Sequence, residues 1–174
     1  MVSTQRRSIQ TRGVQTRHAQ TRAVQTRAPL VLPTGGAQEF FFSDGLLGLS
    51  TYQHFLLRRY QPEDGSTSPF FLLNAKDQEE KLSLPCIEPF LFAPAYQLSP
   101  PVEVLALLQA GSLAEVVVLV IVTLRDRMEE ITANLQGPLL LNPKAGLGLQ
   151  LVVERFPVRR PLLAQGGGKK AQPS

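Results

Sequence analysis

The chain has 174 residues, 43% of them hydrophobic and 18% charged, so it is long enough to bury the core of one ordinary domain. Its single cysteine, Cys86, excludes an internal disulfide, and the first thirty residues contain no apolar stretch of the kind that a secretion signal requires. We therefore expect one domain that folds without covalent cross-links in the reducing cytoplasm.

The net charge of +4 is unevenly distributed. Residues 1–34 contain six arginines and no acidic residue, whereas residues 39–163 contain ten basic and fourteen acidic side chains, a net charge of −4. Nucleic acid is a poor electrostatic match for this acidic part, so we expect its partners to be basic or neutral proteins. The longest apolar run, Val116 to Leu124, is too short for a membrane-spanning helix, which needs about 20 residues.

The chain begins with an arginine-rich arm, residues 1–37. Gln-Thr-Arg recurs at 10–12, 15–17, 20–22 and 25–27, and a period of five matches neither a helix nor a strand. Because the repeated residues are polar, we predict that the arm is disordered and that residues 164–174 are a flexible tail. Two alternatives stay open: the arm binds RNA directly, or translation starts at Val31 and leaves the arm out.

The region from 38 to 163 is predicted to be a mostly β domain, because short apolar runs are separated there by Gly, Pro and Asp turn signals. Residues 116–122 and 139–141 are apolar at consecutive positions, so these strands should be covered on both faces. A small antiparallel barrel satisfies both observations. The predicted strands are 39–42, 54–60, 69–75, 82–87, 115–124, 131–135, 139–142 and 149–155.

One helix is predicted, at 100–110. Ser99 can cap its first turn, the prolines at 100 and 101 fit its start, and Gly111 can close its end. Its apolar side should plug one end of the barrel, and that side consists of Val104, Leu105, Leu107 and Leu108.

Catalytic and metal-binding patterns are not found in the sequence. His18 and His54 are far apart, Cys86 lies in an apolar strand, and Gly146-x-Gly148 lacks the third glycine of a dinucleotide site. We expect no catalytic activity, no cofactor and no metal. Two acidic groups are either solvated loop charges or a docking surface for a basic protein, namely Asp77, Glu79 and Glu80, and Asp126, Glu129 and Glu130.

Several segments together resemble the FliW family of flagellar assembly factors, in the same order and with the same spacing. These segments are Phe42-Ser-Asp-Gly-Leu-Leu-Gly-Leu49, Pro69-Phe-Phe-Leu-Leu-Asn74, Pro85-Cys-Ile-Glu-Pro-Phe-Leu-Phe-Ala-Pro-Ala-Tyr96, Val118-Leu-Val-Ile-Val-Thr123, Thr132-Ala-Asn-Leu135, Gly137-Pro138, Leu141-Asn-Pro143, Gln150-Leu-Val-Val153 and Arg159 to Leu162. The chain departs from the family pattern at Leu47, where the family has proline, at Leu72 for a common Trp, at Ala93 and Ala95, and at 145–149, where basic residues are missing.

The resemblance implies a partner switch. Proteins of this family bind the translational repressor CsrA and newly made flagellin, and bound flagellin releases CsrA to repress flagellin mRNA. The polar residues of the matched motifs are the candidate partner contacts: Asn74, Glu88, Tyr96, Thr132, Asn134, Asn142 and Arg159. For Asn134 and Asn142 the alternative is a structural role, because asparagine readily bonds its own backbone in turns.

Overall fold

The structure, a computed structural model, describes residues 30–32, 36–76 and 82–163, and the predicted disorder of the arm and the tail concerns residues that lie mostly outside these ranges. Its strands are β1 (Ala37–Phe42), β2 (His54–Arg59), β3 (Phe70–Ala75), β4 (Ser83–Ile87), β5 (Val117–Thr123), β6 (Thr132–Ala133), β7 (Leu139–Asn142), β8 (Leu147–Gln150) and β9 (Arg160–Pro161). The helix α1 spans Val102–Leu107, and single turns of 3-10 helix are η1 (Pro89–Leu91), η2 (Leu113–Glu115) and η3 (Met128–Glu130).

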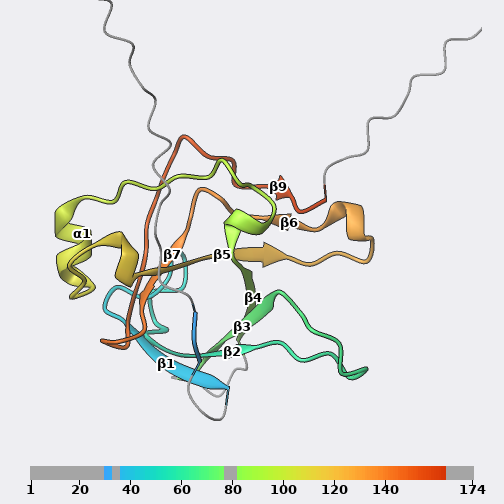
Figure 1. The fold of residues 1–174 in the computed structure, drawn as a ribbon, viewed down its shortest axis with the longest axis horizontal. Helices are drawn as coiled ribbons and strands as arrows, with labels where there is room; N and C mark the ends of the chain where they lie inside the picture. Colours follow the sequence, from blue (N-terminus) through green and yellow to red (C-terminus); the bar gives the residue numbers. More distant parts are fainter. Residues whose placement is uncertain (1–29, 33–35, 77–81, 164–174) are drawn as a thin grey trace, which may run out of the picture.

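Seven strands close into a barrel in the order β4-β3-β2-β1-β8-β7-β5, with β4 pairing to β5. The predicted mostly β fold with one short helix is confirmed. All of these pairs are antiparallel except β1 with β8, which is parallel. Beyond the barrel, β6 pairs with the end of β5 and with β9. Figure 1 shows β1 to β3 at one end of the molecule, and β6 and β9 at the opposite end.

The barrel interior is filled by alternate residues of every barrel strand except β8. Phe40 and Phe42 of β1, Phe55 of β2 and Leu119 of β5 are buried in this first core cluster. Alternation along a strand places every second side chain on one face, which is why these positions meet inside the barrel. Gly148 of β8 makes room for them, because a Cβ there would lie 2.4 Å from the Phe42 ring.

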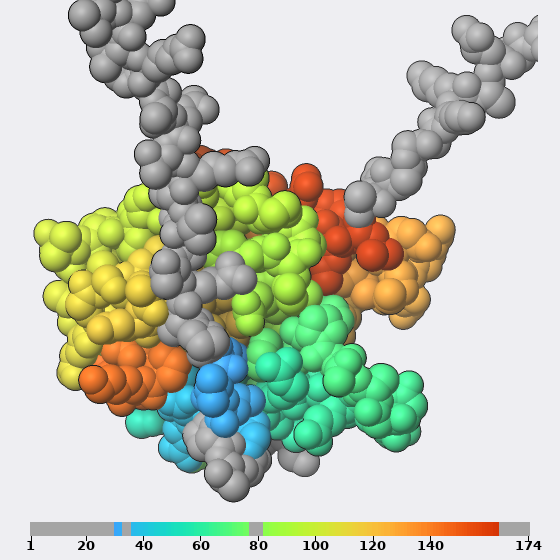
Figure 2. Space-filling view, viewed as in Figure 1, coloured from blue at the N-terminus to red at the C-terminus, as the bar shows by residue number. Residues whose placement is uncertain are grey.

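A second core cluster lies on the outer face of β5 and β7. It contains the other set of alternate residues, Val116 to Val122 at even positions and Leu140, together with Leu108 near the end of α1. The prediction that these strands are covered on both faces therefore agrees with the burial. In Figure 2 the surface of residues 90–115, coloured lime to yellow, lies above the blue and teal surface of β1 and β2.

The predicted helix is shorter than expected and ends differently. Its N-cap is Pro101, without a side-chain cap, so the predicted role of Ser99 is wrong. Gln109, with φ of 53°, takes the left-handed position expected of Gly111, and the amides of Gln109 and Ala110 bond to the carbonyls of Ala106 and Leu105. Leu107 is 63% exposed, so the apolar side is narrower than predicted. Val104 and Leu105 pack against the second cluster, so the helix lies on the outer face of the barrel and does not plug one end of it.

The last predicted strand, 149–155, is displaced. β8 spans Leu147–Gln150, and after it only the amides of Leu151 and Val153 bond back, to the carbonyls of Pro138 and Gln136. The two-residue strand β9 was not predicted. Prolines at 157 and 161 lack the amide that a longer ladder needs, so the run carries little strand signal.

The barrel contacts extend upstream of the predicted domain boundary at residue 38. Leu30 and Leu32, which the sequence places in the arm, pack against the first core cluster. Among the described residues, no helix is long and apolar enough to cross a membrane.

Candidate protein-binding surfaces

The loop from Ser43 to Ser50 is held in a tight, glycine-dependent shape. The amide of Gly45 bonds to the Phe42 carbonyl at 3.1 Å, and the amide of Leu49 bonds to the Leu46 carbonyl at 2.8 Å. Gly45 has φ of 65°, and a Cβ there would lie 2.7 Å from the Cα of Ser50. Gly45 is therefore a structural requirement of this loop.

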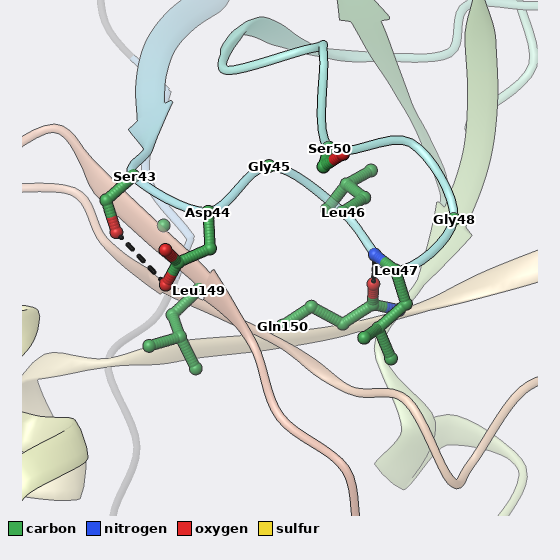
Figure 3. A pocket seen from close by; sticks show the side chains of 10 residues that line it. Ser43, Asp44, Gly45, Leu46, Leu47, Gly48, Ser50, Leu149 and Gln150 are labelled. Atoms are coloured by element: carbon green, nitrogen blue, oxygen red, sulfur yellow. Dashed lines mark hydrogen bonds between the residues drawn. The ribbon is translucent and has the colours of Figure 1, made fainter.

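A depression of about 250 Å³ lies between this loop and β8 (Figure 3). Its two walls are joined by Gln150, whose Oε1 accepts a hydrogen bond from the Leu47 amide at 2.8 Å while its Nε2 donates to the Gly137 carbonyl at 3.2 Å. Ser43, Asp44 and Ser50 supply two hydroxyls and a carboxylate to the lining. These groups suit a polar or basic side chain of a partner. The exposed side chain of Leu47 lies at its edge.

Of the two side chains best suited to covalent or acid–base chemistry in the described residues, Cys86 is withdrawn from the surface and His54 is exposed. Cys86 is fully buried, its thiol contacts the Leu84 carbonyl, and burial raises its pKa far above the ordinary value. His54 lies beside the Phe41 ring, with centroids 5.0 Å apart. Within residues 30–32, 36–76 and 82–163 there is no group of three His, Cys, Asp or Glu side chains that could hold a metal ion.

Tyr96, a predicted contact residue, is buried and fixes two loops. Its hydroxyl donates to the Leu135 carbonyl at 2.8 Å, and its ring lies 4.3 Å from the ring of Phe156. Burial raises the pKa of this phenol, and the nearby positive charge of Arg155 opposes that shift only in part. Arg155 in turn donates to the Gln97 carbonyl at 2.6 Å and stacks over Phe156. Tyr96 can therefore act on a partner only through the loops it positions.

Asn134, Thr132 and Arg159 lie in the same region as Tyr96. The side-chain oxygen of Asn134 accepts the amides of Gln136 and Gly137, both at 3.0 Å, which is the turn-forming role that the sequence left open. Thr132 is half-buried in β6 opposite Pro161, and Arg159 is exposed immediately before β9. These residues form one neighbourhood around β6 and β9.

Asn142 lies elsewhere and is 2% exposed. Its Nδ2 donates to the carbonyls of Leu108 and Gln109 at 2.8 and 3.2 Å, and its Oδ1 accepts the amides of Lys144 and Ala145 at 3.1 and 3.4 Å. One side chain thus ties the end of α1 to the turn between β7 and β8. This structural role accounts for Asn142 in the motif Leu141-Asn-Pro143.

Asn74 and Glu88 are half-buried. Asn74 is in β3, opposite Leu56 and Ser83. Glu88 lies between β4 and η1. Of the two acidic groups, residues 77–80 lie outside the described residues, and Glu129 and Glu130 are 3.6 and 3.9 Å from Arg127, which reduces their net charge.

Sequence reasoning missed Leu47 and Gln150 as residues of the depression. The substitution of Leu47 for the family's proline marked the position, but nothing in the sequence paired it with Gln150, 103 residues away. The described part of the chain is thus a small closed barrel with a polar depression beside β8, a buried cysteine and an exposed histidine beside the Phe41 ring.

Comparisons with known proteins give the family. The family model described as FliW protein matches residues 23–162. A flagellar assembly factor FliW of Treponema denticola is 34% identical over 110 residues, covering 63% of this chain and 71% of that protein. The Treponema pallidum protein of the same name is 32% identical over 130 residues, covering 74% and 83%. A crystal structure of the flagellar assembly factor FliW superposes with a TM-score of 0.64 at 25% identity, covering 78% of this chain and 92% of that one. The chain belongs to the FliW family.

Proposed function

We propose that this protein is a cytoplasmic flagellar assembly factor that acts by binding two proteins in turn, a CsrA-type translational regulator and flagellin. The observation that carries the proposal is the family match over residues 23–162, which includes every described strand and the loop at 45–48. The relatives it resembles are named flagellar assembly factors. The sequence resemblance to FliW adds the identity of the two partners.

The proposed mechanism is competition by mass action. When flagellin is abundant it occupies the barrel, the regulator is set free, and the free regulator represses translation of flagellin mRNA. Such a switch requires mutually exclusive complexes of comparable affinity, because a much tighter complex with one partner would no longer respond to the other. No catalytic step is needed, which agrees with the burial of Cys86.

The charge of the barrel region supports protein partners over nucleic acid. Residues 39–163 carry ten basic and fourteen acidic side chains, so a basic RNA-binding protein is attracted and the phosphate backbone is repelled. The RNA-binding alternative depends on the arm alone, which carries six arginines.

Burial divides the candidate contact residues into two groups. Arg159 is exposed, and Asn74, Glu88, Thr132 and Asn134 are half-buried, so these five can touch a partner. We propose that Tyr96 and Asn142 shape the loops instead.

The test is isothermal titration of the full chain with the CsrA-type regulator and the flagellin of the same organism, each separately. We expect both to bind, and Arg159→Ala to weaken one complex while Arg58→Ala, an exposed arginine of β2, serves as the matched control. The proposal fails if the folded protein binds neither. Salt-sensitive binding of RNA by this protein alone, lost when residues 1–34 are removed, would favour the RNA-binding alternative.

A further inference from the structure

An apolar groove of about 420 Å³ lies between the barrel and the β6–β9 extension. Phe70 of β3 and Ile87 of β4 contribute to it from the barrel, and Leu91, Leu124, Met128 and Leu163 contribute from the surrounding segments. In Figure 2 the green, light-orange and red surfaces that contain these segments meet at the right-hand side of the molecule. None of the candidate contact residues lines this groove.

The rim of the groove is unusually exposed for large apolar side chains. Leu91, Leu124, Met128 and Leu163 are 60%, 56%, 63% and 49% exposed, although they come from three separate segments, namely η1, the connection between β5 and β6, and the residues after β9. Together they present roughly 400 Å² of apolar surface, the size of the largest patches on ordinary monomers, which are often functional. Isolated exposed apolar side chains need no explanation, but four that converge on one groove indicate a binding surface.

Backbone groups of several residues that line the groove are already hydrogen-bonded. The amide of Phe70 bonds to the Ser68 hydroxyl, and the amides of Leu91, Ile131 and Leu162 bond to the carbonyls of Glu88, Met128 and Ile131. Ile87 is paired on both sides, with Phe70 and with Val120. An extended peptide laid here would leave its own amides and carbonyls without partners, which is costly. A helix satisfies its backbone internally and presents only side chains, so it fits this lining.

Two other occupants fit less well. A second copy of this chain would bury about 800 Å² on each partner in a stable dimer, so the groove would be only part of such an interface. The residues that follow Leu163 are Ala-Gln-Gly-Gly-Gly-Lys-Lys-Ala-Gln-Pro-Ser, which contain no large apolar side chain to fill the groove.

We propose that this groove is the docking site for an amphipathic helix of a protein partner, which inserts apolar side chains spaced at i, i+3 or i+4, and i+7. The proposal deepens the proposed function, because it assigns part of the partner-binding surface and rests on the existence of such a partner. Since the lining is apolar, the affinity contributed by the groove depends little on salt.

The chain contains two methionines, Met1 and Met128, so labelling the methionine methyl groups with ¹³C gives a direct probe of the groove with an internal control. The labelled full chain is titrated with flagellin, with the CsrA-type regulator, and with a model helical peptide carrying leucines at i, i+3, i+4 and i+7. A peptide of identical composition with dispersed leucines is the control. We expect at least one protein partner and the model helix to shift the Met128 signal, and the dispersed peptide to leave it unchanged.

Variants give the second measurement. Met128→Glu is expected to weaken the same partner at least tenfold, whereas Leu107→Glu on α1 should change the affinity less than twofold. The two residues have the same exposed fraction, 63%, and gain the same charge, so exposure and added charge are matched.

The outcomes separate the two proposals. If both proteins bind by calorimetry but neither moves the Met128 signal, the groove is not the docking site and the proposed function stands. If neither protein binds, the proposed function fails. The groove proposal is then tested by the model helix alone, and it is overturned if the helix leaves the Met128 signal unchanged. A shift that depends only on the concentration of this chain would show self-association and would also overturn it.

Discussion

Asn142 provides the sharpest test of how the structure is held together. Its side chain makes two donated and two accepted hydrogen bonds while only 2% exposed. Asn142→Ala leaves two carbonyls at the end of α1 and two amides of the β7–β8 turn without these partners. At about 1 kcal/mol for each unsatisfied buried group, and with water recovering some of them, we expect a loss of about 2–4 kcal/mol in the free energy of unfolding.

Asn142→Asp adds a dependence on pH. The aspartate side chain can still accept hydrogen bonds from the backbone amides of Lys144 and Ala145. When it is ionised, however, its other carboxylate oxygen faces the carbonyls of Leu108 and Gln109 near the negative end of the helix. Burial and these carbonyls should raise its folded pKa above the unfolded value of about 3.9. The folded state then binds the proton more tightly, so stability relative to wild type should fall as pH rises through the unfolded pKa and the raised folded value.

The assay is urea unfolding of wild type, Asn142→Ala and Asn142→Asp at pH 4 and pH 7. Asn74→Ala, a half-buried asparagine of β3, is the matched control and should cost less than about 1 kcal/mol. A loss below 1 kcal/mol for Asn142→Ala, or an Asp variant that gains stability relative to wild type from pH 4 to pH 7, would refute this account of Asn142.

Three further variants or conditions test other contacts. Gly148→Ala should destabilise the barrel by about 1–3 kcal/mol in urea unfolding, because the new methyl group overlaps the Phe42 ring; an unchanged midpoint would contradict the parallel pairing of β1 and β8. Tyr96→Phe should cost about 1–2 kcal/mol, since it leaves the Leu135 carbonyl unpaired. Because burial raises the pKa of Tyr96, wild-type stability should fall as pH rises above about 10, where the unfolded phenol ionises first, and the Phe variant should lose stability less steeply. Cys86 should react with a thiol reagent only as fast as the protein opens, so rapid labelling of the native protein would show that its burial is misplaced.

The strands of the barrel could be predicted because the pattern of apolar residues indicates which of their faces are buried. Consecutive apolar residues at 116–122 and 139–141 indicated two covered faces, and the two core clusters divide these residues as alternation requires. The exact end of α1 could not be predicted. Gly111 is the residue that the sequence indicates as the end of the helix. Instead, Gln109 adopts the left-handed conformation, and its carbonyl accepts a hydrogen bond from Asn142, which lies 33 residues further along the chain.

The structural setting of the candidate contact residues could be predicted only in part, for a physical reason. A polar residue in a matched motif can either contact a partner or hold the protein's own structure in place. Tyr96 and Asn142 are buried and hold loops in place, so they have the second role. The apolar groove was missed because its residues come from positions 69 to 163, and each looks like an ordinary core residue in the sequence. Only the fold shows that four of them remain exposed at one place.

A displacement titration tests the central claim most directly. The full chain is bound to a fluorescently labelled CsrA-type regulator, and unlabelled flagellin is added while the anisotropy of the label is followed. Our account predicts that the regulator is released completely, with an apparent affinity for flagellin that weakens in proportion to the regulator concentration. Binding of flagellin to the intact complex without any release, or no complex with either protein, would contradict it.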